Sequence, residues 1–302
     1  MRIVVAGGTG FVGKALVTRL AEEEHSAVVL TRHPDKPRLP GKRTVQLVWW
    51  DGRTVGPWAS HIDGADAVLN FAGESIGERW TARRKSLILD SRLNATRAIV
   101  EAIRAARKRP HVLVNASAVG YYGEVVSEEV PESRPKGDGF LADVCDKWER
   151  EARAAESLGV RVVMTRTGVV LGKDGGALPR MMLPFKLFAG GPIGSGRQWF
   201  PWVHRDDLVG ILTSALMNRT LSGPVNVVAP ECVTMKQFCT ALGKAMHRPS
   251  WAPTPAFALR ALLGEMSSMI LTGQKVVPTK LLQSGYAFRF PTVAQALDDV
   301  FK

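Results

Sequence analysis

The sequence is poor in the residues and runs that build disulfides, metal sites and membrane spans. Three cysteines occur in 302 residues, and so odd and sparse a set excludes a disulfide framework and favours a reducing compartment. The six histidines are scattered, and none stands at a metal-ligand spacing from another histidine or a cysteine, so we predict no metal site. No apolar run is long enough to cross a bilayer, and the chain starts directly on a predicted strand. We therefore expect a cytoplasmic protein with no membrane partner.

Acidic residues are in the minority, with 28 Asp and Glu against 40 Lys and Arg and a net charge of +12. Many of the cations lie between Arg79 and Arg109. A nucleic-acid-binding surface is one interpretation. After Trp80, however, this segment contains no aromatic residue on which bases would stack. The pattern therefore favours a solvated helix face with a few residues near cofactor phosphates. We expect a small-molecule substrate and no nucleic-acid partner, and nothing in the sequence indicates an oligomer.

Short apolar runs alternate with helical patterns through the first part of the chain. We predict strands at 3–6, 27–30, 45–49, 67–71, 112–116 and 160–164, and helices at 82–107 and 141–158. This alternation predicts an α/β fold, a Rossmann-type doubly wound parallel sheet. Ligands of such sheets bind beyond the carboxyl ends of the strands, so the loops after residues 6, 30, 71, 116 and 164 are the candidate site.

The sequence changes character after about residue 172, where glycine and proline become frequent. Helical patterns recur there at 206–218, 235–246, 256–263 and 293–301. We predict a Rossmann domain over residues 1–172, with later segments returning to the sheet. Residues 173–302 are predicted to form a smaller, mostly helical C-terminal lobe that carries the substrate site.

Three evenly spaced glycines follow the first predicted strand. Gly7 permits a tight turn, Gly10 lets a pyrophosphate approach the backbone, and Gly13 lets the next helix pack closely on the strand. The start of that helix offers free N–H groups and a positive dipole end to phosphates. We predict a dinucleotide site whose contacts here are Gly7, Thr9, Gly10, Phe11, Val12 and Gly13.

The loop after the second predicted strand indicates which dinucleotide is bound. A site for NAD usually places an acidic residue there to bind the ribose hydroxyls. Here Thr31 and Arg32 stand at that point, and a guanidinium favours the 2′-phosphate of NADP(H). Lys36 is a further candidate contact. The segment Phe71-Ala72-Gly73 after the fourth strand, with small residues at two of its positions, and Arg92 on the following helix complete the predicted cofactor site.

Several motifs together resemble one family. They are Gly7-x-x-Gly10-x-x-Gly13, Asn70-x-Ala72-Gly73, Ser91-Arg92-Leu93, the segment Ser117 to Gly123, Lys147-Trp148-Glu149, Gly168 to Gly172, Met182 to Phe185 and Gly190 to His204. The chain resembles the extended short-chain dehydrogenase/reductases of epimerase/dehydratase type, and most closely the atypical SDR39U1-like epimerase-family proteins. The resemblance covers nearly the whole chain and implies an NADP-binding Rossmann domain with a small substrate lobe.

The resemblance also implies a catalytic serine and a Tyr-x-x-x-Lys pair, in which the tyrosine exchanges a proton with the substrate. Ser117 matches the serine approximately. Leu141 and Cys145 occupy the expected tyrosine and lysine positions, Lys147 is out of phase, and no Tyr-x-x-x-Lys occurs in the chain. Three hypotheses stay open: a reductase that uses Tyr121 or Tyr122 as proton donor beside Ser117, an epimerase or dehydratase of a nucleotide-sugar type of substrate, and a non-catalytic NADP(H)-binding sensor or scaffold.

The glycine-rich segment 190–204 is the predicted substrate loop. Arg197 could meet an anionic or polar group, and Trp199 and Phe200 could form an apolar wall. His204 precedes two aspartates and is read as the start of a helix rather than as a catalytic base.

Overall fold

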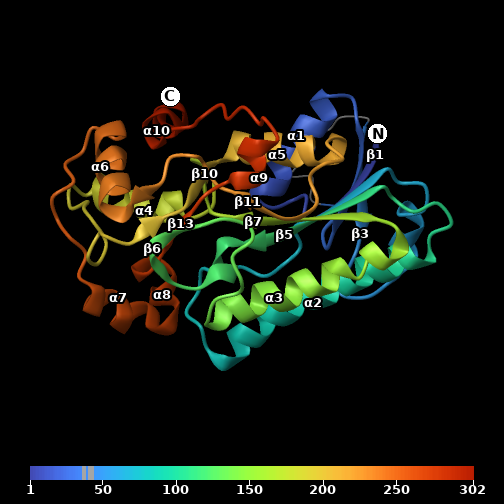
Figure 1. Cartoon of the computed structure of the whole chain (residues 1–302), viewed down its shortest axis with the longest axis horizontal. Helices are drawn as coiled ribbons and strands as arrows, with labels where there is room; N and C mark the ends of the chain where they lie inside the picture. The colour runs from blue at the N-terminus through green and yellow to red at the C-terminus, as the bar shows by residue number, and fades with distance from the viewer. Residues whose placement is uncertain (36–38, 40–43) are drawn as a thin grey trace.

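A seven-stranded parallel sheet forms the centre of the computed structural model, which describes residues 1–35, 39 and 44–302 (Figure 1). The strand order is β11-β7-β5-β4-β1-β2-β3, and every neighbouring pair is parallel. The strands are β1 (Arg2–Ala6), β2 (Ser26–Thr31), β3 (Val45–Trp49), β4 (Ala67–Asn70), β5 (Val112–Ala118), β7 (Arg161–Thr167) and β11 (Gly223–Val227). The order reverses between β1 and β4, which is where doubly wound sheets bind ligands.

Alternate strand residues point to opposite faces, and each face packs on its own set of helices. Ile3 and Val5 lie in one apolar cluster, whereas Val4 and Ala6 lie in the other. The first face is covered by α1 (Phe11–Glu22), α5 (Arg205–Met217) and α9 (Thr279–Gln283). The second face is covered by α2 (Ala82–Ala105), α3 (Phe140–Arg153) and the 3-10 turn η1 (Pro57–His61). Figure 1 shows α2 and α3 side by side under the sheet, with α1 and α5 above it.

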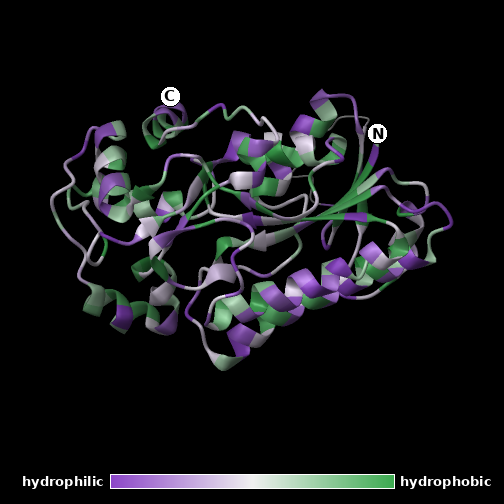
Figure 2. Cartoon of the chain, viewed as in Figure 1, coloured by the Kyte–Doolittle hydropathy of each residue, from purple (hydrophilic) through white to green (hydrophobic). Residues whose placement is uncertain are grey.

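A third apolar cluster belongs to the C-terminal lobe, beside the carboxyl edge of the sheet. Its core includes Phe185, Phe200, Trp202, Phe238 and Leu297. Figure 2 shows the apolar strands enclosed between helices whose outer surfaces, most clearly on α2, are hydrophilic. The remaining helices are α4 (Leu178–Lys186), α6 (Met235–Ala245), α7 (Ala256–Leu263), α8 (Ser268–Leu271) and α10 (Val293–Phe301), with 3-10 turns η2 (Val119–Tyr122), η3 (Glu156–Leu158) and η4 (Gly264–Ser267). Three small sheets pair β6 (Val125–Val130) with β13 (Gln274–Val276), β8 (Val169–Leu171) with β10 (Trp202–His204), and β9 (Trp199–Phe200) with β12 (Val233–Thr234).

The predicted fold class is confirmed by the parallel sheet, its flanking helices and the helical C-terminal region. The helix expected at 141–158 is divided: α3 ends at Arg153, and the turn η3 leads into Gly159, which has a left-handed φ of 78°. Beyond residue 172, β11 is a strand of the central sheet and α5 packs on the first face of that sheet. The boundary at residue 172 stays a prediction. Among the described helices, none combines the length and apolarity that crossing a membrane requires.

Candidate cofactor and active site

The glycine-rich turn after β1 is shaped by close backbone packing at two of the three motif glycines, Gly7 and Gly13. Gly7 has a φ of 78°, and a Cβ on it would lie 2.7 Å from the carbonyl carbon of Phe71. A Cβ on Gly13 would lie 2.3 Å from the carbonyl oxygen of Gly7. Real Cβ atoms do not come so close to backbone, so glycine is required at position 7, where the turn packs on the β4 loop, and at position 13, where the start of α1 packs on the turn.

Gly10 differs, because space lies around it. It is exposed, and the one atom that its Cβ would meet is the carbonyl oxygen of Gly7 at 3.4 Å. Gly10 is also the N-cap of α1, with no side-chain cap and no acidic residue in the first helical turn. The first N–H groups of α1 therefore face an open, uncapped helix start, where an anion is favoured. Thr9, Phe11 and Val12 are partly exposed at this helix start.

The loops after β2 and β4 meet beside this turn. Arg32 is 67% exposed, and among the described residues its guanidinium has one contact, from Nη1 to Oε1 of Glu74 at 3.4 Å. Thr31 is buried and its hydroxyl accepts a hydrogen bond from the His33 backbone N–H at 3.2 Å. Lys36 lies outside the described residues.

Arg92 reaches from α2 to the β4 loop. Its Nη1 donates to the carbonyl oxygens of Glu74 at 3.1 Å and Ile88 at 2.9 Å. The guanidinium lies against Gly73, whose Cβ would be 3.3 Å from Arg92. Burial lowers the pKa of Arg92 from its usual value. Phe71 and Ala72 are partly exposed and Gly73 is exposed, so the structure brings the predicted cofactor residues together at the carboxyl edge of β1, β2 and β4.

A buried amide network under this edge was missed by the sequence analysis. The side-chain amide of Asn70 donates to Thr96 Oγ1 at 2.9 Å and to Asn115 Oδ1 at 2.8 Å. Trp148 Nε1 also donates to Thr96 Oγ1, at 2.9 Å. Asn70 Oδ1 accepts from the backbone N–H of Ala72 at 3.2 Å, which shapes the β4 loop. The sequence signal that could have predicted this network is an asparagine near the end of each of two apolar runs, Asn70 in 67–71 and Asn115 in 112–116.

Ser117 lies at the end of β5 above a buried ion pair. It is 5% exposed, and its hydroxyl donates to Glu149 Oε1 at 2.7 Å. Glu149 also binds Arg166 through two hydrogen bonds of 2.8 Å, with both side chains 2% exposed. Burial alone would lower the pKa of Arg166, but hydrogen bonding to Glu149 raises it above its usual value. Arg166 was not predicted, although a cation at the end of the buried strand β7 needs a partner.

The adjacent tyrosines Tyr121 and Tyr122 have different environments. Tyr122 is 1% exposed; its hydroxyl donates to Asn226 Oδ1 at 2.6 Å and accepts from Arg166 Nη1 at 3.0 Å. Burial raises the pKa of Tyr122 to about 12. Tyr121 is partly exposed, and its ring centroid lies 3.5 Å from the guanidinium carbon of Arg166. Tyr122 is thus buried with its hydroxyl hydrogen-bonded on both sides, and Tyr121 is the more accessible of the two tyrosines.

The positions of the missing Tyr-x-x-x-Lys pair are filled by apolar groups. Leu141 packs against η2, since a Cβ on Gly120 would lie 3.1 Å from the Cβ of Leu141. Cys145 is 3% exposed, and burial, helped by the nearby charge of Glu149, raises the pKa of its thiol to about 11. Lys147 is exposed on another face of α3. The face of α3 toward β5 therefore presents neither a phenol nor an ammonium.

The predicted substrate residues are not gathered around an open pocket. Phe200 is 6% exposed and packs on Phe238 with ring centroids 4.2 Å apart, so it is a core residue. Trp199 is partly exposed and donates to the Val126 carbonyl at 3.1 Å. The cavity that both line is about 10 Å³, room for one water at most. Arg197 is exposed, and no hydrogen bond or ring contact among the described residues joins these three to Ser117 or Tyr121.

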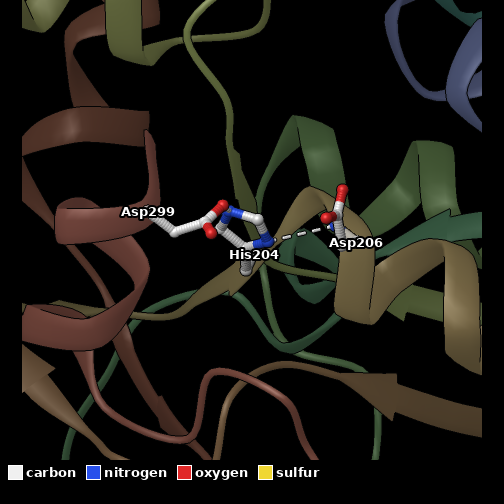
Figure 3. Close-up of side chains that lie close together, drawn as sticks. All are labelled: His204, Asp206 and Asp299. Carbon is white, nitrogen blue, oxygen red and sulfur yellow. Dashed lines mark hydrogen bonds and ion pairs between the residues drawn. The ribbon is translucent and has the colours of Figure 1, made fainter. Parts of the chain in front are cut away.

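His204, Asp206 and Asp299 come together at the start of α5, beside a cavity of about 280 Å³ (Figure 3). Their candidate ligand atoms lie within 4.8 Å of one another, an arrangement that the scattered sequence positions did not reveal. His204 Nδ1 accepts the backbone N–H of Asp206 at 3.2 Å, which assigns the ring proton to Nε2, 3.5 Å from Asp299 Oδ2. Neither ring nitrogen of neutral His204 then has a lone pair for a metal, and the residue is a helix cap.

Comparison with known proteins matches almost the whole chain. The profile of the NAD dependent epimerase/dehydratase family matches residues 3–228, and that of a domain of unknown function, DUF1731, matches residues 254–300. The chain is 44% identical over 301 residues to the Epimerase family protein SDR39U1 homolog, chloroplastic, of Arabidopsis thaliana, covering 98% of this chain and 86% of that protein. It is 39% identical to the Epimerase family protein YfhF of Bacillus subtilis, covering 99% and 98%. The crystal structure of human epimerase family protein SDR39U1 (isoform 2) with NADPH has 37% identity and a TM-score of 0.89, covering 100% of this chain and 99% of that one.

Proposed function

The chain belongs to the NAD dependent epimerase/dehydratase family, and we propose that it binds NADP(H) and acts as an oxidoreductase on a carbonyl or hydroxyl group of a small molecule. The uncapped start of α1 and the open space at Gly10 support dinucleotide binding. The human relative crystallised with NADPH supports the phosphorylated cofactor.

Arg32 is proposed to bind the 2′-phosphate of the adenosine ribose. It is mostly exposed, stands where NAD sites carry an acid, and has one long contact, to Glu74, within the part of the chain that the structure describes. A phosphate would offer it shorter, charge-assisted hydrogen bonds than the 3.4 Å contact. Arg92, with its guanidinium on the Gly73 backbone, is proposed to hold the β4 loop against the cofactor.

The observation that carries the reductase proposal is the position of Tyr121. Its ring stacks on the buried Arg166 of β7, which pairs with Ser117 at the carboxyl end of β5, and Tyr121 stays partly exposed. Bound NADPH would supply a hydride to the substrate carbon. Tyr121 would donate its hydroxyl proton to the substrate oxygen. The stacked guanidinium fixes the ring orientation. The Ser117 hydroxyl already donates its hydrogen bond to Glu149, so its oxygen can only accept a hydrogen bond from the substrate.

Two alternatives remain as second candidates. NADP(H) binding without turnover, as a sensor or scaffold, is favoured by the apolar residues Leu141 and Cys145 where the family places its proton-transfer pair. An epimerase or dehydratase acting on a nucleotide-sugar type of substrate is favoured by the matching family profile.

Calorimetric titration with NADPH, NADP+, NADH and NAD+ tests the cofactor assignment, and NADPH oxidation by a panel of small aldehydes, ketones and quinones tests turnover. Tyr121→Phe is expected to lower turnover about a hundredfold or more with NADPH affinity unchanged. The matched variant Tyr122→Phe is expected to reduce stability, because its buried partners Asn226 and Arg166 lose the hydroxyl. Turnover that survives Tyr121→Phe rejects this proton donor, and tight NADPH binding without turnover favours the sensor.

A further inference from the structure

Four large apolar side chains are exposed together at the far end of the C-terminal lobe. Leu183, Leu187, Phe188 and Trp251 are 56%, 78%, 55% and 70% exposed. They form one surface, since Trp251 Nε1 donates to the Phe188 carbonyl at 3.0 Å and Leu183 lies one helical turn before Leu187, the C-cap of α4. We call these four residues the apolar tip. In Figure 1 the connection from α6 to α7, which carries Trp251, forms the margin of the molecule opposite the N-terminus.

Phe188 has a strained backbone conformation at this surface. It follows the C-cap of α4 and has a left-handed φ of 58°, a conformation that favours glycine and is rare for a bulky residue. The hydrogen bond from Ala189 N–H to the Pro184 carbonyl at 2.9 Å would form equally with glycine at position 188. Phe188 is 55% exposed, so packing within the chain, which includes the contact of its ring with the Arg248 guanidinium, covers only part of this residue.

Cations border the apolar tip, and acids are absent from the two segments that build it. Lys186, which directly precedes Leu187, is exposed, and the guanidinium carbon of Arg248 lies 4.4 Å from the Phe188 ring centroid. The segments 178–191 and 240–252 contain no aspartate or glutamate. The whole chain carries a net charge of +12. The surface is therefore apolar at its centre and positive at its rim.

We propose that the apolar tip docks on the surface of an anionic lipid membrane. Tryptophan, phenylalanine and leucine enter the boundary between headgroups and acyl chains, while lysine and arginine remain at the anionic headgroups. A second copy of the chain fits less well, because a two-fold contact through this patch would bring one cationic rim against the other. The sequence-based prediction of no membrane partner depends on the lack of a spanning segment, and docking on a membrane surface does not require a spanning segment.

The test uses the full chain, flotation, and vesicles of phosphatidylcholine alone or in equal mixture with phosphatidylglycerol. We expect flotation with the anionic vesicles and little with the neutral ones. Leu187→Ser combined with Trp251→Ser should weaken binding about tenfold or more. Lys186→Gln and Arg248→Gln should each weaken it about fivefold and reduce its salt dependence. The matched control is Trp49→Ser, which removes a tryptophan 59% exposed on β3 at the other end of the molecule and should change nothing.

Each alternative occupant gives a different result. No flotation of the wild type with anionic vesicles overturns the proposal. A dimer in sedimentation velocity that Leu187→Ser with Trp251→Ser abolishes, without vesicle binding, would place a second copy on the tip. Soluble polyglutamate could also bind, compete with the vesicles and bind equally well to the variant with both serine substitutions. That result would indicate an acidic protein partner and would also overturn the proposal. Unchanged NADPH affinity of each variant shows that it is folded, whether or not the protein turns over a substrate.

Discussion

Replacing Glu149 with glutamine should destabilise the fold far more than its small change in shape suggests. Glu149 accepts two hydrogen bonds of 2.8 Å from Arg166 and one of 2.7 Å from Ser117, with both charged side chains 2% exposed. The amide of glutamine would turn one acceptor into a donor facing a donor and leave the guanidinium without its counter-charge. Removing one partner of a buried pair typically costs about 3–5 kcal/mol, a large share of the roughly 5–15 kcal/mol that stabilises a protein.

The same helix supplies the matched control. Glu151, two positions further on α3, pairs with Arg97 at 2.5 Å, but these side chains are 26% and 52% exposed. Glu151→Gln should therefore cost about 0.2–1 kcal/mol, as exposed pairs do. Urea unfolding followed by far-UV circular dichroism measures both free energies of unfolding, and the comparison is valid where the slopes agree.

A double replacement separates lost charge pairing from lost packing. Glu149→Leu with Arg166→Met removes both charges, so it should recover much of the stability that Glu149→Gln loses. If Glu149→Gln costs no more than Glu151→Gln, the pair is not desolvated and the reasoning is refuted. If the double variant stays as unstable as Glu149→Gln, packing rather than the unpaired guanidinium carries the cost.

Three further outcomes are expected. Gly10→Val should abolish NADPH binding in calorimetry while the temperature of thermal unfolding stays nearly unchanged. Gly13→Val should lower the unfolding temperature, because a Cβ there would lie 2.3 Å from the Gly7 carbonyl oxygen. The reverse pattern would refute the assignment of Gly10 to cofactor binding and of Gly13 to packing. Arg32→Asp should weaken NADPH about tenfold to a hundredfold more than NADH, and an equal loss for both would exclude the 2′-phosphate contact. Burial lowers the pKa of His204, so the unfolded chain takes up its proton first and stability falls as the pH drops below about 6.5; in thermal melts against pH, His204→Asn should flatten that decline, and an unchanged slope would assign it to other groups.

The central sheet was predictable because its signals are local. β3, α7 and α10 have the predicted bounds, and the long helix α2 ends two residues before the prediction. Buried parallel strands are short apolar runs, and helices show their apolar face at a fixed spacing, so both can be read within one segment. The segment expected as one helix at 141–158 was less accurate, since its last turn is the 3-10 turn η3 before Gly159.

The cofactor edge was also largely predictable from the chain order. In a parallel sheet the strands end at one edge, so residues placed directly after β1, β2 and β4 had to come together there. Gly7, Arg32 and Phe71 are such residues. The role of Gly13 follows from its contact with Gly7 within the turn, whereas the role of Gly7 also depends on the backbone of Phe71 in the β4 loop.

The sequence by itself thus determined which segments are strands of the central sheet, where the glycine turn lies, and that the chain has no Tyr-x-x-x-Lys pair. Only the tertiary structure separated Tyr121 from Tyr122, adjacent residues of one type with opposite exposure. It also paired Glu149 with Arg166 from α3 and β7, and turned Phe200 into the core. Local patterns carry backbone conformation and burial of a face, but the partner of a buried charge and the exposure of one ring depend on which distant segments pack against them.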